Sequence, residues 1–207
     1  MIKNVVFDFG QVLVRFDPLY MVKKHVAEEN DARLIAEVLF DRLYWDRLDA
    51  GTITDEEVIS LSKARLPQRL ADKVEEIYYN WIYNLPQIPG MRELLKHLKE
   101  VYGVKLFLLS NISAYFAKHS GEMEILRDFD KCIFSALCKK VKPNKDIYAH
   151  LCSECNISPN ETVFIDDNAG NISGAEDFGV LTYLFDGDAE RLKDYLDKLL
   201  KDRKIIV

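Results

Sequence analysis

Polar residues that could do chemistry stand directly after short apolar runs at three places in the sequence. They are Asp8, the pair Ser110-Asn111 and the pair Asp166-Asp167. Apolar runs of this length are typical of strands that are buried on both faces of a parallel sheet. Right-handed crossovers place the C-terminal ends of such strands on one edge of the sheet, where open α/β sheets bind their ligands. We therefore expect these residues to converge on one site, although they are far apart in the sequence.

The carboxylates expected at this edge, those of Asp8, Asp166 and Asp167, would repel one another if all were charged. A divalent cation removes this conflict, and hard oxygen ligands with an open coordination position suit Mg²⁺, which also recruits phosphate oxygens. Lys142 would place a compact positive charge beside a phosphate and its nucleophile. The Ser110 hydroxyl can donate a hydrogen bond to a phosphate oxygen. These residue types therefore favour metal-assisted chemistry on a phosphate group.

Short runs rich in β-branched and aromatic residues predict strands at residues 5–7, 105–109, 132–134, 162–165 and 180–184. From about residue 90 onward, helical patterns lie between these runs. This alternation predicts an α/β fold with a doubly wound parallel sheet. The tail from Asp188 to about Lys201 predicts an amphipathic helix that packs on the sheet domain.

The region from residue 17 to residue 88 has no convincing strand run and predicts an all-helical cap inserted after the first strand. Asp17-Pro18 offers an N-cap followed by proline at the first helical position. Thr54 with Glu57 is typical of a capping box. We expect a core of residues 1–16 and 89–207 and a cap of residues 17–88.

The chain has 207 residues, a length that fits one domain with or without an inserted subdomain. Its net charge is −6. The acidic balance disfavours nucleic acid and anionic membrane as main partners. No apolar stretch approaches the roughly 20 residues that span a bilayer. The N-terminal segment reaches Asp8 too soon for the core of a signal peptide. We therefore expect a cytoplasmic protein, either a monomer or a small homo-oligomer.

Cys152 and Cys155 form a C-x-x-C at the end of a predicted helix, where the helix dipole disfavours thiolates. The sequence contains no second C-x-x-C. Ordinary reduced thiols are therefore favoured over a zinc or redox site.

Four ordered segments together resemble the motifs of the haloacid dehalogenase (HAD) superfamily of hydrolases. They are residues 5–13 around Asp8, residues 108–111, Lys142-Pro143 and residues 164–171. Each segment is a weak signal alone, but four segments in this order and at suitable spacing are a strong one. The resemblance covers nearly the whole chain, including the helical cap inserted after the first motif. The resemblance implies a Rossmann-like HAD core and a Mg²⁺-dependent phosphatase that acts on a small phosphorylated metabolite.

Carried over to this sequence, the resemblance implies that Asp8 is the nucleophile and forms an aspartyl-phosphate, which splits one hard displacement into two easier ones. The Asp8 carboxylate and the backbone carbonyl of Gly10 would bind Mg²⁺. Asp167 would be a direct metal ligand, and Asp166 either a ligand or a neighbour of the metal. Lys142 would balance charge during catalysis.

The phosphate group would be bound by Ser110, Asn111, Lys142 and the backbone at Gly10. Asn171, within the fourth motif, has two interpretations, because an asparagine in a helix turn also bonds to nearby backbone.

The cap residues Trp45 and Arg47 precede a loop that, in related proteins with helical caps, descends over the active site. They are candidates for substrate contacts. A packed aromatic ring and an exposed arginine are equally good interpretations.

Position 10 departs from the pattern, because most phosphatases of this superfamily have a second aspartate two residues after the nucleophile. That residue protonates the leaving oxygen and later activates water, which is typically worth about 10²–10⁴-fold in rate. A branch that includes bacterial glucose-1-phosphate phosphatases resembles this sequence and also has glycine there. Since an anomeric leaving group needs less protonation, Gly10 predicts a sugar phosphate substrate and a preference for good leaving groups.

Two other functions are compatible with parts of the pattern. A 2-haloacid dehalogenase uses an aspartate nucleophile without metal and also lacks the second aspartate. Dehalogenases generally have small neutral residues at the positions of Asp166 and Asp167, which argues against this reaction. A non-catalytic protein that binds a phosphorylated ligand would explain Gly10 but not the retention of the other motif residues.

Overall fold

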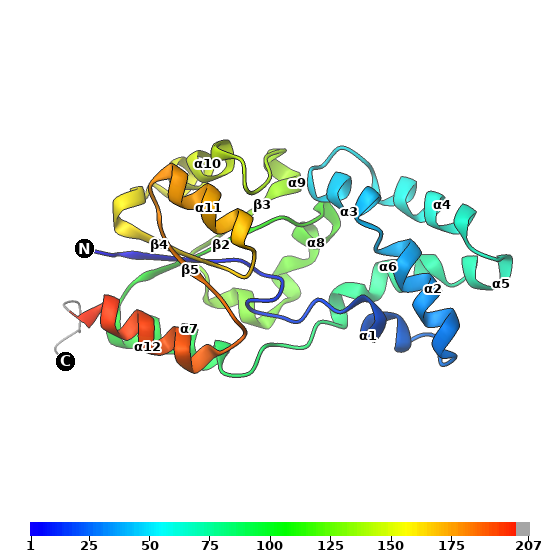
Figure 1. Ribbon diagram of the computed structural model, residues 1–207, viewed down its shortest axis with the longest axis horizontal. Helices are drawn as coiled ribbons and strands as arrows, with labels where there is room; N and C mark the ends of the chain where they lie inside the picture. Colours follow the sequence, from blue (N-terminus) through cyan, green and yellow to red (C-terminus); the bar gives the residue numbers. More distant parts are fainter. Residues whose placement is uncertain (202–207) are drawn as a thin grey trace.

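The structure is a computed structural model that describes residues 1–201. Five parallel strands form one sheet in the order β3-β2-β1-β4-β5 (Figure 1). The strands are β1 (Asn4–Phe7), β2 (Lys105–Ser110), β3 (Lys131–Phe134), β4 (Thr162–Asp166) and β5 (Leu181–Leu184). Each strand coincides with an apolar run of the sequence, so the prediction of a doubly wound α/β fold is confirmed.

Strand β1 lies at the centre of the sheet, and all its residues are buried. Its last residue, Phe7, pairs with Ile165 of β4. This register brings Asp8 level with Asp166, and the Asp8 amide donates to the Ile165 carbonyl oxygen at 2.9 Å. On the other side of β1, strand β2 ends at Ser110. The predicted convergence of polar residues therefore follows directly from the strand register.

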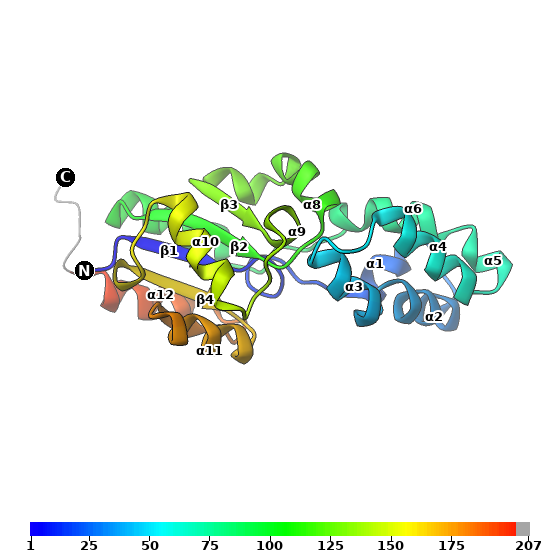
Figure 2. The same cartoon turned by 90° about the horizontal axis from the view of Figure 1, so that it is seen from above.

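Helices cover both faces of the sheet (Figure 1 and Figure 2). One face carries α10 (Lys145–Cys155) and α11 (Ala169–Phe178), and the other carries α7 (Met91–His97), a π-helical continuation (Leu98–Tyr102) and α12 (Ala189–Leu199). Because side chains alternate along a strand, Val6 packs in one hydrophobic cluster while Val5 and Phe7 pack in the other. The predicted C-terminal amphipathic helix is α12, and Asp188 caps it by accepting from the Arg191 amide at 3.0 Å.

The segment between β1 and α7 contains no strand of the sheet and forms a helical lobe beside the C-terminal ends of the strands (Figure 1). Its helices are α1 (Pro18–Lys23), α2 (Glu29–Leu39), α3 (Arg42–Asp49), α4 (Asp55–Arg65), α5 (Gln68–Ala71) and α6 (Val74–Asn80), followed by a 3₁₀ turn at Trp81–Tyr83. The Asp17 side chain accepts from the Tyr20 amide, and Thr54 and Glu57 form the predicted capping box. These helices make up the cap.

The two chain segments that join the cap to the sheet lie side by side. The Arg15 amide donates to the Pro86 carbonyl oxygen at 2.8 Å, and the Ile88 amide donates to the Leu13 carbonyl oxygen at 2.9 Å. The domain boundaries predicted at residues 17 and 88 stay a prediction. Two short helices of the core, α8 (Ala114–His119) and α9 (Ser135–Cys138), follow β2 and β3.

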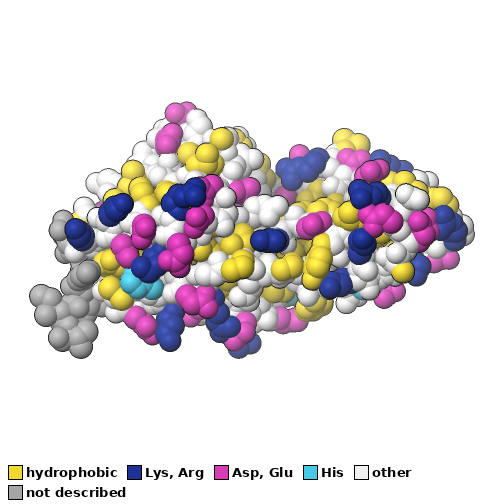
Figure 3. Space-filling view, turned by 60° about the horizontal axis from the view of Figure 1, so that its bottom comes forward, with side chains coloured by type: hydrophobic (Ala, Val, Ile, Leu, Met, Phe, Trp, Pro, Cys, Tyr) yellow, Lys and Arg dark blue, Asp and Glu magenta, His cyan; other side chains and the backbone are white. Residues whose placement is uncertain are grey.

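The surface carries mixed charge. Figure 3 shows lysine and arginine side chains interspersed with aspartate and glutamate over one face of both lobes. Among residues 1–201, no helix combines the length and the apolar character needed to cross a membrane.

Candidate active site

A cavity of about 380 Å³ lies between the C-terminal edge of the sheet and the cap. The core side of its lining contains most of the predicted site residues, namely Asp8, Gly10, Ser110, Asn111, Lys142 and Asp167. Asp166 lies beneath them and is fully buried. Residues from four separate stretches of the chain are thus brought together at one place.

Lys142 lies between two carboxylates at the floor of the cavity. Its Nζ atom is 2.8 Å from Asp8 Oδ1 and 2.7 Å from Asp166 Oδ2, and its side chain is 1% exposed. Burial alone would lower the pKa of Lys142, but Asp8 and Asp166 outweigh it and raise that pKa above its ordinary value. The ammonium therefore stays charged beside the predicted nucleophile.

Asn111 holds the backbone of Lys142 in place. Its Nδ2 donates to the Lys142 carbonyl oxygen at 3.0 Å, and its Oδ1 accepts from the Lys142 amide at 2.9 Å. Asn111 was predicted as a phosphate-binding residue, and these contacts give it a positioning role that the sequence did not indicate.

The Asp166 carboxylate is saturated with donors. Asn171 Nδ2 donates to its two oxygens at 3.1 Å and 3.0 Å, the Asn168 amide donates to Oδ1 at 2.8 Å, and Lys142 Nζ donates to Oδ2. This leaves little capacity for a metal, so Asp166 fits the second of its two predicted roles, a neighbour of the metal. Asn171, whose role was open, lines the cavity and orients Asp166.

Asp8, Asp166 and Asp167 each offer a carboxylate oxygen, and these oxygens lie within 4.8 Å of one another. Burial raises the pKa of Asp8 to about 6 despite the attraction of Lys142. Burial and the neighbouring Asp166 also raise the pKa of Asp167. The single ammonium of Lys142 does not balance three carboxylates, and a hard divalent cation would supply the missing positive charge. Because Asp166 is saturated, Asp8 and Asp167 are the carboxylates that fit as direct ligands, with the Gly10 backbone beside them.

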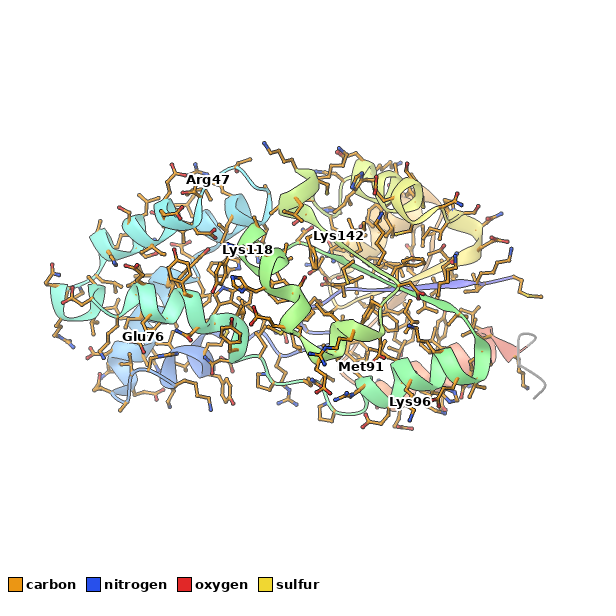
Figure 4. The ribbon with its side chains drawn as sticks, turned by 180° about the vertical axis from the view of Figure 1, so that it is seen from behind. Arg47, Glu76, Met91, Lys96, Lys118 and Lys142 are labelled. Atoms are coloured by element: carbon orange, nitrogen blue, oxygen red, sulfur yellow. The ribbon has the colours of Figure 1, made fainter. Side chains whose placement is uncertain are left out.

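The cap side of the cavity is formed largely by α3. Arg42, Trp45 and Asp49 line it, and their spacing puts them on one face of the helix. Arg47 is exposed and does not line the cavity, and Figure 4 shows it on the cap, away from Lys142. Arg42 and Asp49 are not among the predicted site residues, but the helical periodicity of α3 was a signal that could have found them.

Trp45 is both packed and part of the site. It is 5% exposed, and its ring centroid lies 4.7 Å from that of Phe40. Trp81 and Phe16, which also line the cavity, contact Trp45 in the same aromatic cluster. The cap thus presents mainly aromatic surface to the site, with Arg42 and Asp49 as ionisable groups.

The cysteines of the C-x-x-C lie outside the cavity lining, on the last turns of α10. Cys152 and Cys155 are free, and burial raises the pKa of Cys155 to about 11. A neutral thiol is a poor nucleophile and a poor metal ligand, which agrees with the interpretation as reduced thiols.

The chain is similar in sequence to enzymes of known activity. The chain is 27% identical to a D-ribitol-5-phosphate phosphatase of Bacteroides thetaiotaomicron over 201 residues, covering 88% of this chain and 91% of that protein. It is 30% identical to an (S)-2-haloacid dehalogenase of Burkholderia cepacia over 138 residues, covering 65% of this chain and 58% of that protein.

Among solved structures, a variant of a HAD family enzyme from Bacteroides thetaiotaomicron was crystallised with magnesium and inorganic phosphate. It has the same fold, with a TM-score of 0.67 at 22% identity, covering 93% of this chain and 99% of that one. Residues 2–179 match the haloacid dehalogenase-like hydrolase family. The chain therefore belongs to the haloacid dehalogenase-like hydrolases.

Proposed function

We propose that this hydrolase is a Mg²⁺-dependent phosphatase that cleaves a small phosphate ester, with Asp8 as the nucleophile. The observation that carries the proposal is the contact of Asp8 with buried Lys142, next to the oxygen of Asp167 in one carboxylate cluster. A dehalogenase also uses an aspartate nucleophile, but its reaction does not require a cluster of carboxylates that binds a cation. The magnesium and phosphate in a structure of the same fold support the assignment.

In this mechanism Asp8 attacks phosphorus and forms an aspartyl-phosphate, which water then hydrolyses. Lys142 offsets the negative charge of the phosphate and holds Asp8 in place. Ser110 donates a hydrogen bond to a phosphate oxygen. Asp8, Asp167 and the Gly10 carbonyl would hold Mg²⁺, which would supply positive charge to the phosphate oxygens.

We further propose a sugar or sugar-alcohol phosphate as the substrate. The cavity of about 380 Å³ is at the small end of the usual range for ligand sites, which suits a small metabolite. The relative named for D-ribitol 5-phosphate supports this class. The expectations of a cytoplasmic location and of a monomer or small homo-oligomer stay predictions.

The test is a phosphatase screen with Mg²⁺ that includes sugar phosphates, run beside Asp8→Asn. This variant keeps the size of the side chain but removes the nucleophile, so it should lose nearly all turnover. Full activity of Asp8→Asn would contradict the mechanism. Lack of any hydrolysis by the wild-type protein, together with tight binding of one phosphorylated compound, would favour the non-catalytic alternative.

A further inference from the structure

The cap contributes a carboxyl group to the cavity that the mechanism above does not use. Asp49 is the last residue of α3, it is 7% exposed, and it lines the same cavity as Asp8. Its Oδ1 is buried and has no hydrogen-bond partner among the described residues. A buried carboxyl oxygen without a partner is costly, so it requires an explanation.

Asp49 is fixed relative to the core, although it belongs to the cap. Its carbonyl oxygen accepts from Ser135 Oγ at 2.6 Å, and the same Oγ accepts from the Ile112 amide at 2.9 Å. Gly51 allows the loop to approach α9 closely, because a Cβ there would lie 2.5 Å from the Ala136 carbonyl oxygen. The φ of Gly51 is also positive, at 66°. Asp49 is thus held in place at its backbone while its carboxyl group stays free to react.

The complementary feature is the empty space at Gly10. A Cβ built on this residue would meet no heavy atom within 4 Å, apart from its chain neighbours, among the described residues. The position where related phosphatases carry an acid therefore holds no side chain here. The cavity nevertheless contains a further carboxyl group, that of Asp49, which the cap supplies.

We propose that Asp49 is the general acid and general base of this site, in place of the acid missing at position 10. This inference rests on the proposed phosphatase function. In the first step an Asp8 oxygen bonds to phosphorus as the bond from phosphorus to the leaving oxygen breaks, and the Asp49 proton passes to that oxygen. In the second step the Asp49 carboxylate takes a proton from water. The water oxygen then bonds to phosphorus, the bond to Asp8 breaks, and protonated Asp49 is restored.

The electrostatic surroundings suit both steps. Burial raises the pKa of Asp49 to about 7, against the opposing effect of Arg42 on the same helix. Asp46 and Asp8 raise the pKa further, and Lys142 lowers it. The acid and base forms are therefore both accessible near neutral pH, which is where a general acid–base catalyst is most effective.

The decisive experiment compares kcat/KM of the wild type and Asp49→Asn on two kinds of phosphate ester, each with Mg²⁺. Ribitol 5-phosphate has a basic leaving oxygen, so its hydrolysis should fall by about 10²–10⁴-fold in the variant. The p-nitrophenolate group of p-nitrophenyl phosphate leaves without protonation, so kcat/KM for this ester should change by no more than about threefold. The matched control is Asp72→Asn, an exposed aspartate of the cap that does not line the cavity, and it should retain both activities. Equal losses on both esters, or no loss on either, would overturn the assignment of Asp49.

Two further readouts separate catalysis from structural damage. For the wild type, kcat/KM on ribitol 5-phosphate should fall as the pH rises above about 7, because Asp49 loses its proton, and Asp49→Asn should lack this limb. Adding Gly10→Asp to Asp49→Asn should restore at least about tenfold of the lost rate, since the space at position 10 accepts a side chain. An unchanged pH profile in Asp49→Asn would contradict the proposal.

The outcome also distinguishes the two proposals. A wild-type protein that hydrolyses neither ester with Mg²⁺ refutes the phosphatase function and the role of Asp49 with it. An active wild type with an unaffected Asp49→Asn variant refutes only the role of Asp49.

Discussion

Replacing Lys142 with methionine removes the ammonium that contacts two carboxylates at the floor of the site. The Nζ atom lies 2.8 Å from Asp8 and 2.7 Å from Asp166, and the side chain is 1% exposed. Removing one partner of a buried ion pair typically costs about 3–5 kcal/mol, because the remaining charge stays buried without compensation. Methionine keeps most of the side-chain volume, so a cavity adds little. We expect the free energy of unfolding to fall by about 3–5 kcal/mol at about pH 8 without Mg²⁺.

The destabilisation should depend on pH with a defined sign. Burial raises the pKa of Asp8 to about 6 even though Lys142 lowers it. Without the lysine, the folded-state pKa of Asp8 rises further above its unfolded value. The folded variant then binds more protons than its unfolded state, so its stability increases as the pH falls through this range. The difference from wild type should therefore be smaller at about pH 5 than at about pH 8.

Urea unfolding at both pH values measures these differences. The control is Lys145→Met, since the Lys145 side chain is 64% exposed and its change should stay within about 0.5 kcal/mol. Adding Asp166→Asn to Lys142→Met removes one uncompensated charge and should recover part of the loss. The reasoning is refuted if Lys142→Met lies within about 1 kcal/mol of wild type at about pH 8, or if its loss does not vary with pH.

Three further predictions concern the parts around Lys142. Gly51→Ala forces a Cβ to 2.5 Å from the Ala136 oxygen and should lower kcat/KM on alkyl phosphates by at least about tenfold. The control is Gly179→Ala, because the φ of Gly179 is also positive, at 97°, but its Cβ would meet no neighbour within 4 Å. This variant should change kcat/KM by less than about twofold. Equal losses of kcat/KM in the two variants would contradict the docking of the Gly51 loop against α9. Asn171→Ala leaves a buried carboxylate short of donors and should cost about 1–3 kcal/mol in urea unfolding, whereas unchanged stability would argue against the hydrogen bonds to Asp166. EDTA should abolish phosphatase activity and added Mg²⁺ should restore it, while chloride release from a 2-haloacid that survives EDTA would support the dehalogenase.

The sheet and the location of the site could be predicted from the sequence because both depend on local patterns. Apolar runs define the strands, and the parallel topology forces Asp8, Ser110 and Asp166 to one edge. Helix caps such as the box at Thr54 and Glu57 involve neighbouring residues and are equally readable.

The separate roles of the residues within the site could not be predicted, because they depend on contacts between residues that are distant in the sequence. The hydrogen bonds of Asn111 to the Lys142 backbone join positions in two different loops. Asp166 and Asp167 are adjacent in sequence, yet one is buried and saturated while the other faces the cavity. The sequence alone does not show that these two carboxylates differ in the hydrogen-bond donors around them.

The cap was the weakest part of the prediction for a related reason. The sequence predicts Trp45 and Arg47 only from their proximity to a loop, whereas the rotation of α3 decides which residues reach the cavity. That rotation brings Trp45, as well as Arg42 and Asp49, to the cavity and turns Arg47 to the surface. If Gly10 left the site without an acid, the wild type would prefer esters with good leaving groups. With Asp49 as the acid, the Asp49→Asn variant shows that preference instead.

In the proposed mechanism Asp8 carries the phosphoryl group during turnover. The direct measurement is mass spectrometry of peptides from protein quenched in acid during steady-state hydrolysis with Mg²⁺. We expect a phosphoryl group on the peptide that contains Asp8, and neither this modification nor turnover in Asp8→Asn. Rapid turnover by Asp8→Asn, or a phosphoryl group on a different residue of an active wild type, would contradict it.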